Sequence, residues 1–106
     1  MSTVKRVRPR PVLDKVEGTI EVRGSGYGID QEERSVIEVT PFVSEPAYVR
    51  VNVGLTEAMG TKFEFVRVDV GITMPCYPEE VNEVVERVAE QASLLLQEEI
   101  NRWKGV

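Results

Sequence analysis

The hydrophobic residues of this chain alternate with polar residues over four stretches, and the spacing then becomes helical. Alternation with a period of two is typical of a β-strand that buries one of its faces. It occurs in residues 17–23, 33–40, 47–55 and 62–74. We therefore predict four β-strands in these ranges, each with one apolar face and one polar face.

The last of these strands has two possible arrangements of its aromatic residues. In an unbroken alternation, Phe63, Phe65 and Arg67 lie on the face opposite to the valines. A bulge between residues 65 and 66 would instead move both phenylalanines onto the core face. The sequence leaves both arrangements open.

A single long helix is predicted after the strands. Pro78 suits the first position of a helix, and Glu79 and Glu80 suit the positive end of the helix dipole. Apolar residues then recur at intervals of three and four, and Gly105 fits the residue that follows a helix. The pattern predicts a helix over 78–104.

Four strands followed by one helix predict an α+β fold. A four-stranded antiparallel sheet with short turns would bury its apolar face under the helix. A chain of 106 residues supports one such core, which we assign to residues 16–106 as a single domain. Residues 1–15 show no period and contain Pro9 and Pro11, so we predict a flexible, basic arm there.

The predicted helix has more apolar surface than one sheet face requires. Leu94, Leu95 and Leu96 are consecutive, so they point about 100° apart around the helix axis. Together with Ile100 and Trp103 they cannot all face one sheet. One explanation is a broad buried side of the helix. We favour the other, a helix–helix interface of a homodimer that uses these five residues.

A glycine-rich stretch, "GSGYGID", lies between the first two predicted strands. A dinucleotide-binding loop needs G-x-G-x-x-G between a strand and a helix, whereas here the spacing differs and a strand follows. We therefore predict a hairpin loop in which Gly24, Gly26 and Gly28 adopt positive φ angles around Tyr27. Tyr27 at its tip could contact a partner.

The composition excludes several kinds of chemistry. The chain has no histidine, which removes the commonest general base, the commonest transition-metal ligand and every histidine-activated nucleophile. The single cysteine, Cys76, cannot form an internal disulfide and is interpreted as a small buried hydrophobe in a reducing, cytoplasmic protein. No apolar run approaches the roughly 20 residues that span a bilayer. We expect no enzymatic activity, no metal and no cofactor.

The pairing of residues 47–55 with 62–74 would gather aromatic and basic side chains on one polar face. Single-stranded nucleic acid is bound by such faces, because bases stack on rings while cations contact phosphates. The alternative is that the phenylalanines belong to the core or a dimer contact. The candidate residues on this face are Tyr48, Arg50, Phe63, Phe65 and Arg67.

The basic arm allows two interpretations. Basic extensions on acidic domains often tether nucleic acid with an affinity that depends on salt, and they also occur as solubilising tails. The chain is otherwise acidic, with a formal net charge of −5. The arm residues that would contact phosphates are Lys5, Arg6, Arg8 and Arg10.

The predicted helix also carries an outward acidic stripe. Glu79, Glu83, Glu86 and Glu90 recur at helical spacing. Such a stripe is usually solvated, but it can also mimic nucleic acid toward a basic protein. This gives a second hypothesis, in which the protein is a modulator that docks on an enzyme through its acidic helix and loops.

Residues 49–100, and above all the junction "VRVDVG…PCYPEEV", resemble small proteins encoded by tailed bacteriophages. Separately, four strands followed by a dimerising helix are similar in topology to the single-stranded-DNA-binding fold of the positive-cofactor and Whirly families. These resemblances imply a phage-encoded homodimer in the host cytoplasm. The expected function is non-enzymatic binding of single-stranded nucleic acid in replication, recombination or transcription.

Overall fold

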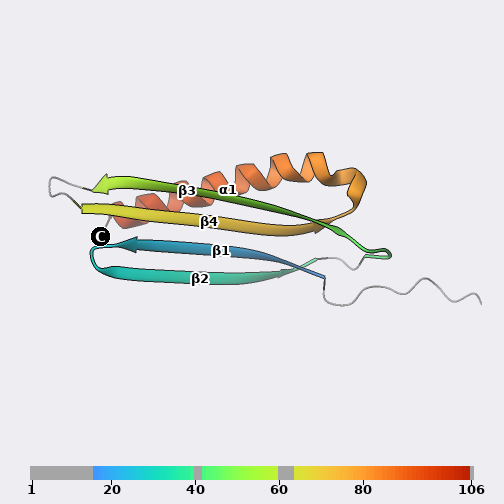
Figure 1. Cartoon of the computed structure of the whole chain (residues 1–106), viewed down its shortest axis with the longest axis horizontal. Coiled ribbons are helices and arrows are strands. Elements are labelled where there is room, and N and C mark those ends of the chain that lie inside the picture. Colours follow the sequence, from blue (N-terminus) through green and yellow to red (C-terminus); the bar gives the residue numbers. More distant parts are fainter. Residues whose placement is uncertain (1–15, 40–41, 60–63, 106) are drawn as a thin grey trace, which may run out of the picture.

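The computed structural model describes residues 16–39, 42–59 and 64–105, which form an α+β domain with a four-stranded antiparallel sheet and one long C-terminal helix (Figure 1). This confirms the predicted fold class. No helix in the described part of the chain is long and apolar enough to cross a membrane. The predicted arm, residues 1–15, lies outside the described residues. The elements are β1 (Glu17–Gly26), β2 (Ile29–Glu38), β3 (Ala47–Met59), β4 (Glu64–Cys76), a 3-10 turn η1 (Pro78–Glu80) and α1 (Val81–Lys104).

The sheet consists of two hairpins placed side by side. Its strand order is β2-β1-β4-β3, with β1 and β4 paired antiparallel in the centre. The connection from β2 to β3 therefore joins opposite edges of the sheet, as Figure 1 shows. Each hairpin links strands that are consecutive in sequence, as the short turns predict.

The hairpin between β1 and β2 is tighter than the sequence indicates. Gly26 pairs directly with Ile29, so the turn contains only Tyr27 and Gly28. Their φ angles are 51° and 73°, which is the pattern of a two-residue type I′ turn. The predicted loop over 24–30 is therefore wrong, because most of its residues extend the two strands.

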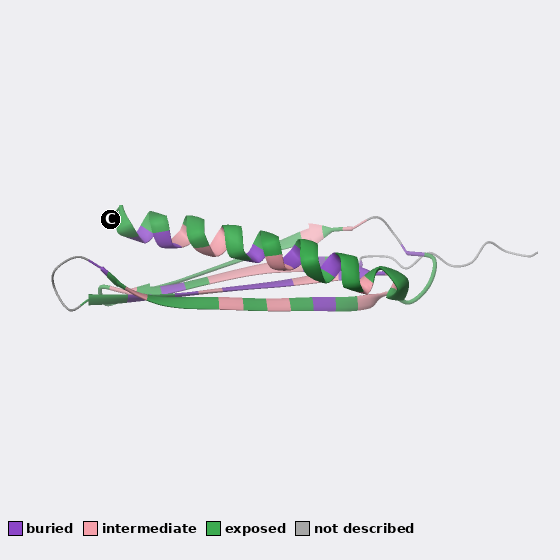
Figure 2. Ribbon diagram, turned by 90° about the horizontal axis from the view of Figure 1, so that it is seen from above, coloured by how far each residue is buried: buried purple, intermediate pink, exposed green. Residues whose placement is uncertain are grey.

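The register of the strands places the apolar side chains on one face. Ile72 of β4 lies opposite Ile20 of β1 on one side and Val51 of β3 on the other. Val66 and Val68 on the same face of β4 are fully buried. Helix α1 lies along this face and packs mainly against β3 and β4 (Figure 2). The predicted alternation of the strands is thus confirmed.

The helix begins and ends close to its predicted limits. The backbone N–H of Tyr77 donates to the Glu80 carboxylate at 3.0 Å, which fixes a 3-10 first turn before the α-helix begins. At the other end, Lys104 pairs with Glu57 of β3 at 3.2 Å, and Gly105 follows the last helical residue. This ion pair joins the C-terminal end of α1 to the sheet edge formed by β3.

The apolar residues of α1 differ widely in exposure. Ile100 and Trp103 expose 0% and 4% of their surface and belong to the core of the chain itself. They therefore offer no surface to a second copy. Leu95 and Leu96 are half-buried, whereas Leu94 is 55% exposed. Part of the apolar excess of the helix is thus used within one chain.

Trp103 determines why β1 contains a glycine at position 24. A Cβ atom on Gly24 would lie 2.6 Å from the indole Nε1 of Trp103, so a larger residue would displace the indole. The ring of Tyr27 stacks on Trp103 with 6.2 Å between the ring centroids. The predicted loop tip is therefore held against the end of the helix.

Candidate functional site

The face of the sheet opposite α1 is covered by no described element, and we call it the open face (Figure 2). Alternation along the strands directs polar side chains to it. Each strand contributes one arginine to this face: Arg23 from β1, Arg34 from β2, Arg50 from β3 and Arg67 from β4. The four guanidinium groups make the open face the best candidate for a binding surface.

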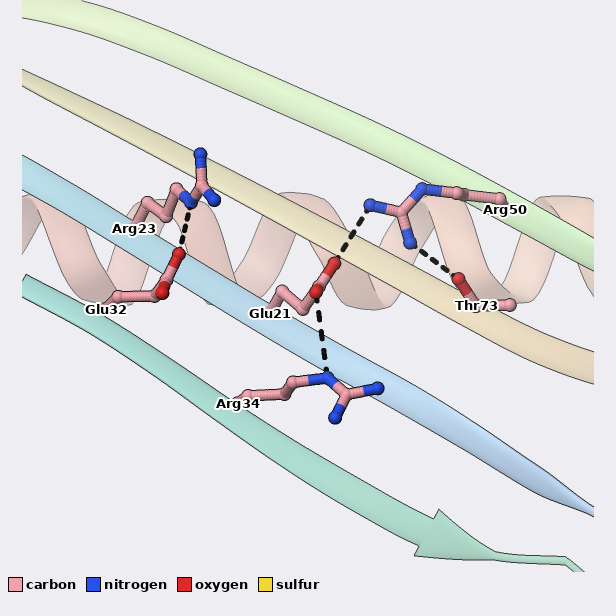
Figure 3. Close-up of polar contacts among 6 residues, drawn as sticks. All are labelled: Glu21, Arg23, Glu32, Arg34, Arg50 and Thr73. Carbon is pink, nitrogen blue, oxygen red and sulfur yellow. Dashed lines mark hydrogen bonds and ion pairs between the residues drawn. The ribbon is translucent and has the colours of Figure 1, made fainter.

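Ion pairs across the strands hold the first part of the open face. The Glu21 carboxylate accepts a hydrogen bond from Nη2 of Arg50 at 3.0 Å and pairs with Nε of Arg34 at 3.7 Å (Figure 3). Arg23 pairs with Glu32 on the neighbouring strand. Glu21 thus connects β2 and β3 across β1 and β4.

Arginine–threonine pairs form the second part. Arg50 donates to the Thr73 hydroxyl at 2.6 Å, and Arg67 donates to the Thr56 hydroxyl at 3.3 Å. Both pairs are directly opposite in the β3–β4 register. Arg67 also binds the Asp69 carboxylate at 2.6 Å. An arginine therefore faces a threonine twice, with the arginine on β3 in one pair and on β4 in the other. The hairpin thus has an approximate local twofold symmetry.

Two glycines lie between the arginine–threonine pairs and form a flat floor. A Cβ atom on Gly71 would lie 2.8 Å from Nη2 of Arg50, and one on Gly54 would lie 2.3 Å from Nη2 of Arg67. Each guanidinium group thus lies against the backbone of a glycine. The result is a shallow polar basin, which Glu21 also lines.

Exposed aromatic rings lie at the two ends of this hairpin. Tyr48 is opposite Pro75 at one end and Phe65 is opposite Ala58 at the other, and each of the two aromatic residues is 57% exposed. Ten residues separate these pairs along β3, which corresponds to about 33 Å. Along the hairpin the open face therefore presents a ring, an arginine, two glycines, an arginine and a ring. We call this arrangement the β3–β4 track.

The pairing also decides between the two arrangements of the phenylalanines. The register continues without interruption through Phe65 and Val66, and Phe65 is exposed. The alternative with a bulge that buries Phe65 is therefore wrong. Phe63 lies outside the described residues.

Among the described residues, the open face carries more carboxylates than arginines. The hydrogen bond from Arg50 lowers the pKa of Glu21, and Asp69 raises the pKa of Arg67, so each keeps its charge. Carboxylates therefore neutralise the arginines locally, and we expect the open face to bind anions only weakly through charge. The acidic residues whose positions place them on this face are Glu17, Glu21, Asp30, Glu32, Glu38 and Asp69.

The structure gathers four of the predicted nucleic-acid-binding residues in the β3–β4 track: Tyr48, Arg50, Phe65 and Arg67. The glycine floor, Thr56 and Thr73 were not among the predicted binding residues. Their place in the sequence indicates their face, because they fall on the same alternate positions of these strands as the arginines. The predicted arm residues Lys5, Arg6, Arg8 and Arg10 lie outside the described residues.

Two other predicted features are located elsewhere. The acidic residues Glu79, Glu83, Glu86 and Glu90 are all exposed along the start of the helix. Cys76 is buried beside the helix start, and this burial raises the pKa of its thiol, which disfavours a reactive thiolate. Within residues 16–39, 42–59 and 64–105, no three acidic or cysteine side chains are grouped so that they could hold a metal ion.

Comparison with known proteins adds no relative. No family model, no curated protein and no solved structure matches the chain. Its function is therefore inferred from the geometry of the open face.

Proposed function

We propose that the protein binds single-stranded nucleic acid along the β3–β4 track. The observation that carries the proposal is the exposure of Tyr48 and Phe65 in line with Arg50 and Arg67 on a sheet face that no described element covers. Base–aromatic stacking contributes about 1–3 kcal/mol per base and tolerates any sequence. Rings that are accessible on a flat sheet suit unstacked bases, so we expect a preference for single strands over duplexes.

The arginines can contact phosphates only if their present partners exchange. Their ion pairs with Glu21 and Asp69 are solvent-exposed, and such pairs contribute only about 0–1 kcal/mol each. A phosphate can therefore replace a carboxylate at little cost. The displaced carboxylates stay nearby, so stacking must supply most of the affinity.

Because stacking supplies most of the affinity, we expect the affinity for single strands to depend only weakly on salt concentration. Neutralising two phosphates, one for each arginine of the track, gives a slope of about −1.4 for log K against log salt concentration with a single strand. A steep slope would instead indicate that further basic residues, such as those of the arm, contact the strand.

The proposed contacts stack on bases without distinguishing them, so binding should not depend on the nucleotide sequence. Sequence-independent binding of single strands serves replication, recombination or transcription. We propose such a role in an infected cell, which the resemblance of residues 49–100 to small phage proteins implies. The chemistry needs no cofactor, and we propose that the protein is not an enzyme.

The direct test is binding of fluorescent oligo-dT to the wild type and to a variant with Tyr48→Ala and Phe65→Ala. Loss of both rings should weaken binding by at least about tenfold, because each stacked base contributes about 1–3 kcal/mol. Val36→Ala removes an exposed apolar side chain from the open face of β2 and is the matched control. No binding by the wild type at about 50 mM salt would contradict the proposal.

A second variant separates the sheet from the arm. Deletion of residues 2–11 removes the basic arm and leaves every described element intact. If the sheet supplies most of the affinity, the deletion should lower affinity less than the two aromatic substitutions do. If deletion of the arm alone abolishes binding, the β3–β4 track is not the site.

A second candidate function is docking of a basic protein on the outer face of α1. The exposure of Glu83, Glu86 and Glu90 on this helix favours it. Reversing two of these charges with Glu83→Lys and Glu90→Lys should leave oligo-dT binding within about twofold if the track is the site, since surface charges far from the ligand act weakly. A large effect on a protein partner with no effect on oligo-dT would support this second function.

A further inference from the structure

The two edges of the sheet differ in their protection against pairing with another strand. β2 is dense in charges, which are common on protected edges. β3 has 13 residues, contains neither proline nor lysine, and carries only Arg50 and Glu57 as charged residues. Within the described residues β3 pairs with β4 alone, so the main-chain groups along its outer side have no strand partner. The charged residues of β2 are Asp30, Glu32, Glu33, Arg34 and Glu38.

We propose that β3 pairs antiparallel with β3 of a second copy about a twofold axis at Val53, which joins the two sheets into one of eight strands. The length of β3 selects the register. An axis at Val53, its middle residue, places Ala47 of one copy opposite Met59 of the other. All 13 residues of each strand are then paired. A second copy is the occupant because this strand is complementary to itself.

The same register keeps each face of the combined sheet uniform. Ala47 and Met59 both lie on the face toward α1, and directly opposite residues of an antiparallel pair share a face. Both helices therefore lie on one side of the combined sheet. Both open faces lie on the other side and become one continuous surface.

The side chains that meet across the axis are compatible. Arg50 of one copy lies opposite Thr56 of the other, which repeats the arginine–threonine pairing found twice within the chain. Glu57 lies opposite Val49. No like charges are directly opposite, an arrangement that would destabilise the pairing.

The helices also fit beside each other. Strands in a sheet are about 4.8 Å apart, so two helices that each lie over β3 and β4 would be roughly 10 Å apart, near the 8–10 Å of packed helices. The Lys104–Glu57 pair marks the side of α1 nearest β3. Leu96 and Ser93 recur on that side at helical spacing, and the small serine permits close approach.

The consequence is a paired binding surface. Two β3–β4 tracks would run side by side in opposite directions on the continuous open face. The proposed dimer interface is formed by the β3 edge and the helix. The protein could therefore dimerise whether or not it binds nucleic acid.

Light scattering of the full chain tests this proposal. At about 100 µM we expect a mass about twice the 11.9 kDa of one chain. The variant with Asn52→Lys and Thr56→Lys adds two lysines to the open face of the β3 edge, one of them opposite Arg50 of the other copy, and it should be monomeric. The control, Gln31→Lys with Val36→Lys, adds the same charge to the β2 edge, with Val36 on the open face and Gln31 on the face toward α1. It should stay dimeric.

Two results would overturn the proposal. The first is a monomeric wild type at this concentration. The second is a dimer that survives the β3 lysines while circular dichroism shows both lysine variants folded, which would place the interface elsewhere.

Discussion

The two faces of the sheet use the same strands for different purposes. On β4, Val66 and Val68 point toward α1 and are fully buried, while Phe65 and Arg67, which alternate with them, point to the open face and are exposed. The covered face is apolar and closely packed. The open face has ion pairs that cost little to exchange. Stability and binding should therefore respond to different residues of the same strands, and substitutions can test this separation.

The largest expected loss of stability comes from a substitution on the covered face. Ile100→Ala removes a side chain with no exposed surface and should lower the free energy of unfolding by about 2–5 kcal/mol. Val36→Ala on the open face should change it by less than about 0.5 kcal/mol. Urea denaturation measures both. Equal losses would contradict the assignment of stability to the covered face.

The next effect compares one glycine on each face. In Gly24→Ala the new Cβ collides with the buried indole of Trp103, and we expect a loss of about 1–3 kcal/mol. In Gly71→Ala the new Cβ meets the ends of the Asn52 and Arg50 side chains, which can swing away into solvent. Gly71→Ala should therefore lower the thermal unfolding midpoint less than Gly24→Ala does. The reverse order would show that the open face is rigid.

A smaller effect is expected for the length of the bound strand. The β3–β4 track is about 33 Å long, which suits roughly 5 to 8 nucleotides, within the range of single-strand platforms. Affinity for oligo-dT should rise with length up to this size and then increase only slowly. A plateau at two or three nucleotides would mean that a strand contacts only one end of the track.

The smallest effect concerns the ionisation of Glu21. Arg50 lowers its pKa below the ordinary value of 4.5, so the carboxylate stabilises the fold above that value and this contribution is lost as the pH falls through the lowered pKa. A carboxyl titration by NMR should show a midpoint below 4.5, and Arg50→Ala should raise it. An unchanged midpoint in the variant would show that the hydrogen bond is not kept in solution.

The sequence predicts the elements and their faces better than their ends. Periodicity identifies the buried valines of β4 and the helix because each pattern is local. It misplaces the first hairpin, since Gly24 resembles a loop residue until Trp103, distant in sequence, is seen to require it. Cross-strand partners such as Glu21 and Arg50 depend on strand order and register, which no local pattern contains.

Amide chemical-shift mapping with oligo-dT tests most directly whether the β3–β4 track binds single strands. The amides around Tyr48, Arg50, Phe65 and Arg67 should shift in proportion to the bound fraction, while those of the outer face of α1 should not. Shifts confined to the outer face of α1, or the absence of shifts along the β3–β4 track under saturating oligo-dT, would contradict this prediction.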